Sequence, residues 1–159
     1  RWVLERATRD HALRVDTGRL KAVSLALADA ARLSSQTELI DNLRGIEGQA
    51  AAQYFDVFDE LILQNKEDFF FRTRSRRPPL DNVNAMLSFA YSILAHDCAS
   101  ALEAVGLDPY VGFMHGDRPG RASLSLDLME ELRPCFADRF AVSCVNNRVM
   151  RPEPPLARE

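Results

Sequence analysis

Apolar side chains recur every three or four positions between residues 39 and 61, and this pattern constrains the fold more than any other feature of the chain. Such spacing places the side chains on one face of an α-helix, because the helix has 3.6 residues per turn. The segment therefore predicts a long amphipathic helix with Thr37 as its N-cap. The apolar stripe consists of Leu39, Leu43, Ile46, Ala50, Tyr54, Val57 and Leu61.

Helical periodicity also occurs on both sides of this segment, so the sequence predicts an all-α fold with one multi-helix domain over residues 1–150. The basic segment "RTRSRRPPL" interrupts the pattern, because its prolines cannot lie inside a helix. The segment 136–145 fits either a helix or a buried strand, and the proline-rich tail 151–159 is expected to be irregular. Further helices are expected over 1–13, over 17–33, from a cap at Asp81 or Asn82 to Gly106, and from a cap at Ser123 or Ser125 to Pro134.

The composition suggests a protein of a reducing cytoplasm without a membrane segment. The three cysteines form no C-x-x-C pair among the 159 residues, and an odd number without such a framework is unusual for a disulfide-stabilised protein. No apolar run approaches the roughly 20 residues that span a bilayer, and residues 1–16 are too charged for a signal peptide. The net charge of −3 counts against a surface that is basic throughout, as nucleic-acid-binding proteins usually are.

Three acidic residues lie close together on the short helix expected before Pro134. At 100° per residue, Asp127, Glu130 and Glu131 share one arc, and the leucines occupy the other. Asp127 and Glu130 are three residues apart, so their carboxylates can approach each other. A solvated polar face explains this pattern, and so does a bound cation.

Glu47 lies at the edge of the apolar stripe of the long helix and is flanked by Gly45 and Gly48. A carboxylate there is partly desolvated and needs a partner. Two glycines inside a helix cost about 1 kcal/mol each relative to alanine, so we expect them to permit close approach of a packed helix or a polyphosphate. Tight helix packing beside a surface glutamate is the alternative explanation.

His115 lies in a glycine-rich loop, where a lone histidine is often simply exposed. Together with Glu47 and the acids at 127–131, it would complete a ligand set of one imidazole and several carboxylates. Such a set favours Mg²⁺ or Mn²⁺ over zinc and suits phosphoryl transfer. Phosphates could then be held by the basic residues Arg72, Arg74, Arg76, Arg77 and Arg121.

Three long segments resemble a known family. "LRGIEGQAAAQYF" (43–55), "RPPLDNVNAMLSFAYSILAHD" (77–97) and "GLDPYVGFMHGDRPGRASLSLDLMEELRP" (106–134) are similar, in the same order, to the CRISPR-associated spacer-acquisition integrase family, the first of the CRISPR-associated proteins. The resemblance implies that Glu47, His115 and Glu130 are its metal-binding and catalytic residues. Asp127 then matches an auxiliary acid one turn earlier, which would orient His115 or a water molecule bound to the metal without binding the metal itself.

The resemblance also implies an activity and partners. Such a protein would be a metal-dependent DNA endonuclease and integrase that uses Mg²⁺ or Mn²⁺. It would insert foreign DNA fragments into a CRISPR array by transesterification at a phosphodiester. Its expected partners are double- and single-stranded DNA, a second copy of the full-length protein, a small CRISPR-associated protein of the adaptation complex and an iron–sulfur exonuclease.

The chain departs from the family at its N-terminal side. Family members begin with a β-rich domain, and no segment here resembles it, so the chain corresponds to the helical catalytic domain. The alternative to a catalytic domain is a non-catalytic helical scaffold that binds partner proteins. A di-iron bundle is excluded, because it needs two Glu-x-x-His pairs and the sequence contains none.

Overall fold

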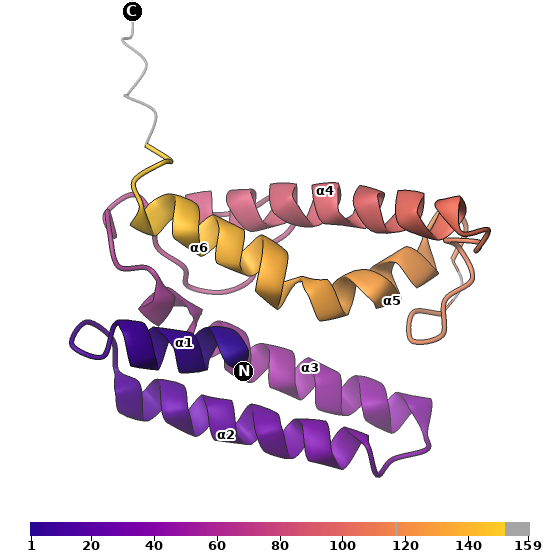
Figure 1. The fold of residues 1–159 in the computed structure, drawn as a ribbon, viewed down its shortest axis with the longest axis horizontal. Helices are drawn as coiled ribbons and strands as arrows, with labels where there is room; N and C mark the ends of the chain where they lie inside the picture. The colour runs from indigo at the N-terminus through magenta and orange to yellow at the C-terminus, as the bar shows by residue number, and fades with distance from the viewer. Residues whose placement is uncertain (117, 152–159) are drawn as a thin grey trace, which may run out of the picture.

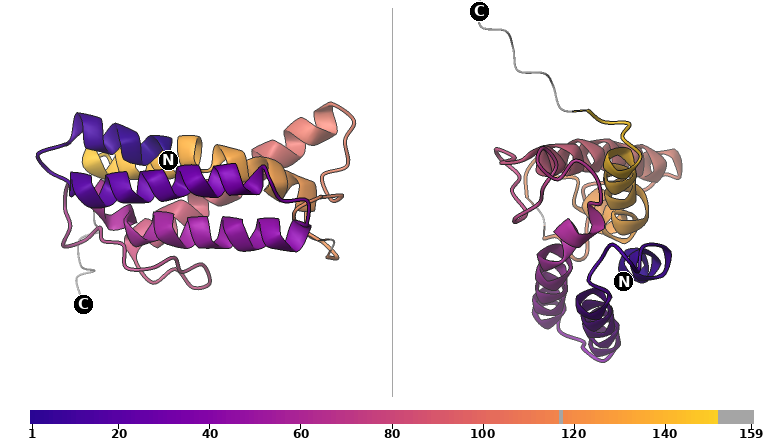
Figure 2. Two further views of the ribbon diagram at one scale, coloured as in Figure 1. Left: turned by 90° about the horizontal axis from the view of Figure 1, so that it is seen from below. Right: turned by 90° about the vertical axis from the view of Figure 1, so that its left-hand side faces the viewer.

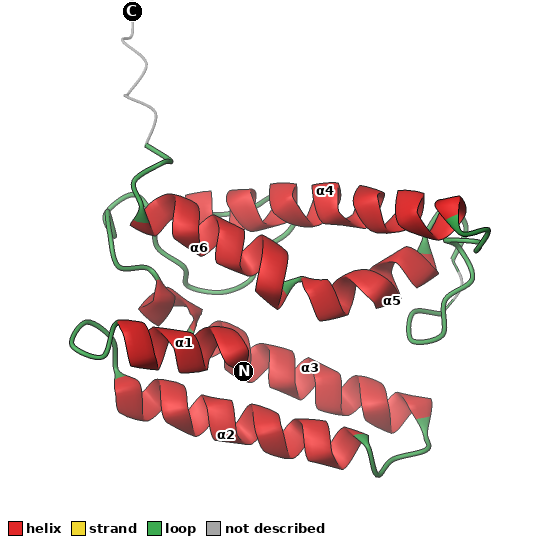
Figure 3. Ribbon diagram, viewed as in Figure 1, coloured by secondary structure: helices red, strands yellow, loops and turns green. Residues whose placement is uncertain are grey.

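The structure, a computed structural model, describes residues 1–116 and 118–151. Every regular element among these residues is helical and none is a strand (Figure 3), which confirms the all-α prediction. The expected irregular tail lies, except for its first residue, outside the described residues. The elements are α1 (Trp2–Asp10), α2 (Thr17–Ser34), α3 (Ile40–Asp56), the 3₁₀ turn η1 (Phe58–Leu61), α4 (Asn82–Ala104), α5 (Ser123–Leu132), the π-helical turn η2 (Pro134–Asp138) and α6 (Arg139–Asn146).

The helices form two stacked layers (Figure 1). In one layer, α2 packs against both α1 and α3; in the other, α4 packs against α5, η2 and α6. The right-hand view of Figure 2 looks along the helices and shows one layer above the other. Because η1 and the irregular segment 62–81 connect α3 to α4, the chain crosses from one layer to the other only after α3.

Both layers contribute to the apolar core, which is richest in aromatic side chains around η1. Phe58 is fully buried, and its ring lies 4.9 Å from that of Phe71 and 5.7 Å from that of Tyr54, measured between centroids. Such pairs stabilise beyond the area they bury. The remaining core side chains include Leu4, Leu20, Val57, Leu61, Ile62, Phe69, Val83, Leu87, Ala141 and Val145.

A buried carboxylate provides a polar link between the layers. Tyr54 of α3 donates a hydrogen bond of 2.9 Å to Oδ2 of Asp138, and Tyr91 of α4 donates one of 2.5 Å to Oδ1. Burial raises the pKa of Asp138 even though these two hydrogen bonds lower it. A buried carboxylate with both oxygens satisfied fixes the relative position of the elements that it joins.

Two of the predicted caps are wrong and one is right. Asp81 caps α4, accepting from the backbone N–H of Asn84 at 2.7 Å. Thr37 does not cap α3, because it lies in the turn after α2 and the helix starts three residues later. Neither predicted serine caps α5: Ser123 is its first residue, and Ser125 donates to the carbonyl of Ala95 at 2.6 Å.

The long helix is shorter and more exposed than its apolar stripe predicts. It ends at Asp56, and the chain then tightens into η1, so Val57 and Leu61 lie outside the helix. Leu39 is 66% exposed, and Tyr54 is the only buried residue of α3. Its main packing partner is α2.

The last part of the described chain is helical, which excludes the buried strand over 136–145. α4 has 23 residues and is apolar enough to span a membrane by length and composition alone, although Asp97 and Glu103 interrupt its apolar residues. Because α4 is the helix on which α5, η2 and α6 pack, we assign it as the central helix of its layer. It buries Val83, Leu87, Ala90, Cys98 and Leu102.

Candidate metal centre

Three segments that are far apart in the sequence meet between α3 and α5. Glu47 comes from the exposed half of α3, His115 from the loop before α5, and Asp127 and Glu130 from α5 itself. The structure therefore brings together the residues that the sequence selected. How they are held differs from one residue to the next.

Asp127 anchors the loop that carries His115. Its Oδ2 accepts hydrogen bonds from the backbone N–H groups of Phe113 and Met114 at 2.7 and 3.0 Å, and its Oδ1 accepts from that of His115 at 3.0 Å. The side chain is fully buried. Burial raises the pKa of Asp127, but the hydrogen bonds from the His115 side chain and these three backbone groups outweigh it, so the pKa is lowered overall.

Gly112 makes this close approach possible. A Cβ at this position would lie 2.6 Å from Cβ of Ser123 and 2.9 Å from Oδ2 of Asp127. Both distances are too short for any side chain, so the loop reaches the start of α5 only because residue 112 is glycine.

The His115 ring is held between two carboxylates of α5. Its Nδ1 lies 2.6 Å from Oδ1 of Asp127, and its Nε2 lies 3.6 Å from Oε1 of Glu130. Because Asp127 is ionised, it selects the tautomer with the proton on Nδ1. Nε2 then carries the free lone pair, as a metal-binding imidazole requires.

Glu47 and Glu130 form a pair of like charges. A hydrogen bond between the two side chains is the largest cause that raises the pKa of Glu47 to about 7; partial burial and the charge of Glu130 add to it. Arg133 partly offsets this, and it donates to Oε1 of Glu130 at 2.8 Å. Two carboxylates so close share a proton unless a cation replaces it.

The donor set fits a hard divalent cation. It offers carboxylate oxygens and one imidazole nitrogen, which suit Mg²⁺ or Mn²⁺ better than a thiolate-selective ion. Within residues 1–116 and 118–151, no three His, Cys, Asp or Glu side chains already enclose a position for an ion. Glu130 is instead paired with Arg133, whose Nη1 lies 2.8 Å from its Oε1.

Two cavities open beside these residues. One of about 380 Å³ is lined by the acids Glu47, Asp127, Glu130 and Glu131 and by apolar side chains of α2 and α3. The other, of about 410 Å³, is lined by Glu47 and His115 together with three arginines. The arginines are Arg44, Arg118 and Arg121.

Of these arginines, the sequence selected only Arg121. Arg44 donates to the carbonyl of Met114 at 2.8 Å, and Arg121 donates to that of Gly116. Arg44 precedes Glu47 by three residues and therefore lies on the same face of the helix. That spacing is the signal that could have identified Arg44, whereas Arg118 lies in an irregular loop without periodicity.

The four arginines of the predicted phosphate-binding segment do not behave alike. Arg72, Arg76 and Arg77 are exposed. Arg74 is half-buried and donates to Oδ1 of Asn84 at 2.8 Å, and its guanidinium stacks on the Tyr91 ring at 5.2 Å. Internal contacts therefore hold Arg74, whereas the role of all four arginines in binding DNA stays a prediction.

The two helix glycines beside Glu47 do not serve close packing within the described residues. A Cβ at either Gly45 or Gly48 would meet no atom within 4 Å. The packed-helix explanation is therefore wrong for this structure. Both glycines leave the backbone around Glu47 uncovered, beside the arginine-lined cavity.

Fold and centre together define a class: a helical domain that gathers carboxylates and one imidazole beside a cavity lined with arginines. The chain belongs to the family of CRISPR-associated protein Cas1, whose sequence model matches residues 1–154. It is 54% identical over 155 residues to CRISPR-associated endonuclease Cas1 2 of Rhodospirillum rubrum, covering 95% of the chain and 45% of that protein. It is 44% identical over 130 residues to a CRISPR-associated exonuclease Cas4/endonuclease Cas1 fusion of Geobacter sulfurreducens, covering 80% of the chain and 23% of the fusion.

Solved structures show the same fold. A CAS1 protein from Thermotoga maritima matches with a TM-score of 0.73 and 29% identity over 94% of the chain and 47% of that protein. A casposase bound to integration product matches with a TM-score of 0.68 and 27% identity, over 94% of the chain and 39% of the casposase chain. A chain of a Cas6-RT-Cas1–Cas2 complex matches with a TM-score of 0.74 and 27% identity, over 94% of this chain and 16% of that one. The chain thus spans less than half the length of the relatives that it matches.

Proposed function

We propose that this chain is the catalytic helical domain of a metal-dependent DNA endonuclease and integrase of CRISPR adaptation. Its reaction would be the insertion of foreign DNA fragments into a CRISPR array by attack of a 3′-hydroxyl on a phosphodiester. The observation that carries the proposal is the meeting of Glu47, His115 and Glu130 beside an arginine-lined cavity. Family membership and the printed activities of the relatives support it.

Each residue has a distinct part in the proposed reaction. Glu47, His115 and Glu130 would hold Mg²⁺ or Mn²⁺, and the bound ion would polarise the phosphodiester and stabilise the oxygens that attack and leave. Asp127 positions His115 and fixes its tautomer. Arg44, Arg118 and Arg121 would bind phosphates of the DNA strand.

The same proposal includes partners and a compartment. Double- and single-stranded DNA would be the substrates in the cytoplasm, and the full-length protein would act as a homodimer. The small adaptation partner is proposed because a similar chain is part of a complex with Cas2. The iron–sulfur exonuclease is proposed because a relative is a fusion of Cas4 with Cas1.

The competing function is a non-catalytic scaffold, which the exposed aromatic side chains of Phe89, Phe136 and Phe140 would favour. Nicking of a supercoiled plasmid distinguishes the two. We expect the chain to nick in Mn²⁺, to stop in EDTA and to lose nicking in Glu130→Gln. Nicking that persists in EDTA or in Glu130→Gln would contradict the assignment.

A further inference from the structure

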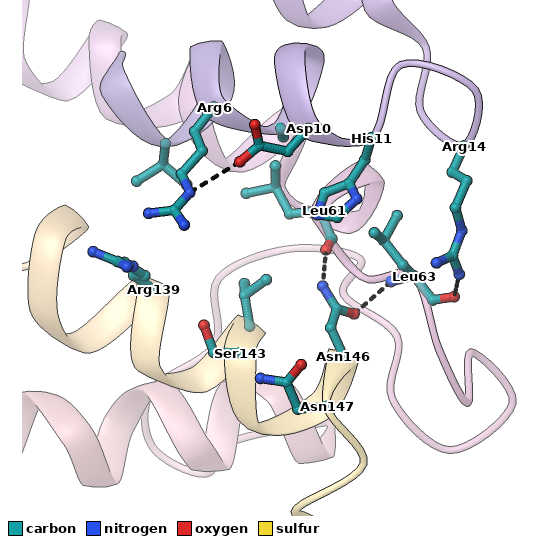
Figure 4. A pocket seen from close by; sticks show the side chains of 13 residues that line it. Arg6, Asp10, His11, Arg14, Leu61, Leu63, Arg139, Ser143, Asn146 and Asn147 are labelled. Carbon is teal, nitrogen blue, oxygen red and sulfur yellow. Dashed lines mark hydrogen bonds and ion pairs between the residues drawn. The ribbon is translucent and has the colours of Figure 1, made fainter.

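A cavity of about 560 Å³ lies between α1, α6 and the segment that follows η1 (Figure 4). None of its lining residues lines either cavity of the candidate metal centre. It lies at the boundary between the two layers, since α1 belongs to one and α6 to the other. Its size is that of a small-molecule site.

Hydrogen-bond donors border this cavity from both helices. Arg6 and Arg14 come from α1 and the turn after it, and Arg139 comes from the start of α6. Asp10 is the only carboxylate among the described residues of the lining, and Arg6 and Arg9 already pair with it at 3.2 and 2.8 Å. The lining therefore carries a net positive charge, since it contains three arginines and one carboxylate.

Arg139 is available to a ligand. Among the described residues it has no hydrogen-bond or ion-pair partner, and its guanidinium lies 5.4 Å from the centre of the Trp2 ring. Arg6 lies 5.7 Å from the same ring. The indole thus holds two guanidinium groups beside the cavity, and Ser143 and Asn147 add neutral donors to its border (Figure 4).

The opposite wall is held by hydrogen bonds. Asn146 donates to the carbonyl of Leu61 at 2.8 Å and accepts from the N–H of Leu63 at 2.7 Å. Arg14 donates to the carbonyl of Leu63 at 2.6 Å. Because these bonds tie the segment after η1 to α6 and to the turn after α1, the cavity is formed before any ligand arrives.

We propose that this cavity binds an organic phosphate monoester, as in a nucleotide or at the phosphorylated end of a nucleic-acid strand. Guanidinium forks match phosphate oxygens, and Arg6 and Arg139 approach the cavity as a pair. The cavity exceeds a bare phosphate, and its apolar lining by Val3, Leu61 and Val142 gives the attached sugar or base a surface.

Binding is tested on the whole chain in EDTA, so that the candidate metal centre does not contribute. The probes for isothermal calorimetry are inorganic phosphate, a nucleoside 5′-monophosphate, and a short single strand with and without a 5′-phosphate. We expect the monophosphate to bind more tightly than inorganic phosphate. A further gain for the 5′-phosphorylated strand would identify a strand end as the source, and no gain would identify the free nucleotide.

Arg139→Ala should weaken binding of the monophosphate at least tenfold, which corresponds to about 1.4 kcal/mol. Arg32→Ala is the matched control, because Arg32 is an exposed arginine paired with Asp29 on α2; it should leave binding unchanged. Replacing Arg44 and Arg121 with alanine should also leave it unchanged, which separates this site from the arginine-lined cavity of the proposed catalytic one. Failure of all phosphate probes to bind, or equal binding by Arg139→Ala and the parent chain at unchanged melting temperature, would overturn the proposal.

Discussion

Nδ1 of His115 lies 2.6 Å from Oδ1 of Asp127, so one carboxylate of α5 decides which nitrogen of the loop histidine faces the candidate metal centre. The same carboxylate accepts three backbone N–H groups of that loop. Ligand orientation and loop conformation therefore depend on a single side chain. Carboxylates that hold a metal-binding histidine in this way are common behind metal ligands.

Asp127→Asn should weaken Mn²⁺ binding by about 10- to 100-fold. An amide has one acceptor oxygen, so it cannot accept from the loop N–H groups and from Nδ1 of His115 together. Calorimetric titration with Mn²⁺ measures the effect. Glu131→Gln removes a charge from the same helix without touching the ring and is the control; equal losses in the two variants would mean that only net charge matters.

Gly112→Ala should displace the loop from α5, because the added Cβ would overlap Ser123 and the Asp127 carboxylate. Overpacking of this kind costs about 1–3 kcal/mol, measured as the free energy of unfolding in urea. Gly116→Ala is the matched control in the same loop, where the nearest atom to a new Cβ is Nη2 of Arg44 at 3.8 Å. If Gly116→Ala destabilises as much, the close approach at Gly112 is not the cause.

Mn²⁺ should raise the melting temperature, because a ligand that binds only the folded state stabilises it by about 2.7 kcal/mol at one hundred times its Kd. Glu130→Gln should leave the metal-free melting temperature unchanged or raise it, since relief of the repulsion with Glu47 offsets the lost ion pair with Arg133. It should abolish the shift caused by Mn²⁺. Thermal unfolding with and without Mn²⁺ tests both statements, and a full shift in this variant would remove Glu130 from the ligand set.

The metal-free protein should lose stability as the pH rises from about 4.5 to 7. The pKa of Glu47 in the folded state is about 7, above its ordinary value of 4.5. The folded state therefore binds this proton more tightly than the unfolded state, and the stabilisation is complete below pH 4.5 and lost by about pH 7. Melting temperatures in EDTA should fall less steeply across this range in Glu47→Gln than in the control Glu38→Gln. Parallel curves would exclude the pair as the cause.

Arg72, Arg76 and Arg77 should contribute to DNA affinity without sequence preference. Replacing all three with alanine should flatten the slope of log affinity against log salt by up to about 0.9 for each duplex phosphate that the variant no longer binds. Arg74→Ala should instead lower stability, because it removes the bond to Asn84. An unchanged salt slope in the triple variant would reduce this segment to a solvated loop that balances Glu67 and Asp68, and would direct attention to Arg44, Arg118 and Arg121.

Helix identity and most helix positions could be predicted from the sequence, because periodicity depends on local spacing. Asp81 as a cap could be predicted for the same reason. The start of α3 could not, since Thr37 has the right chemistry for a cap but lies in the turn that joins α2 to α3. Local propensity does not show where a turn ends.

The residues of the candidate centre could be predicted from residue types and the family resemblance, but the hydrogen-bond partners of the surrounding side chains could not. No spacing rule connects Arg44 to the carbonyl of Met114, which lies 70 residues further along the chain. The internal contacts of Arg74 with Asn84 and Tyr91 could not be predicted either, because a basic run gives no sign of which arginine makes tertiary contacts. Long-range hydrogen bonds are the part of the site that only the structure supplies.

The hydrogen bond from Tyr54 to Asp138 fixes the C-terminal end of α3, so that a small tilt of the helix there would move its N-terminal part by a larger distance. Glu47 lies seven residues from Tyr54, which is about 10 Å along the helix axis at 1.5 Å per residue. A tilt of the helix by about 10° at Tyr54 would move the Glu47 backbone by about 2 Å, whereas metal–ligand distances vary by only about 0.2 Å. The packing of the aromatic core around η1 therefore determines the position of Glu47 in the candidate metal centre, although the core does not contact the centre.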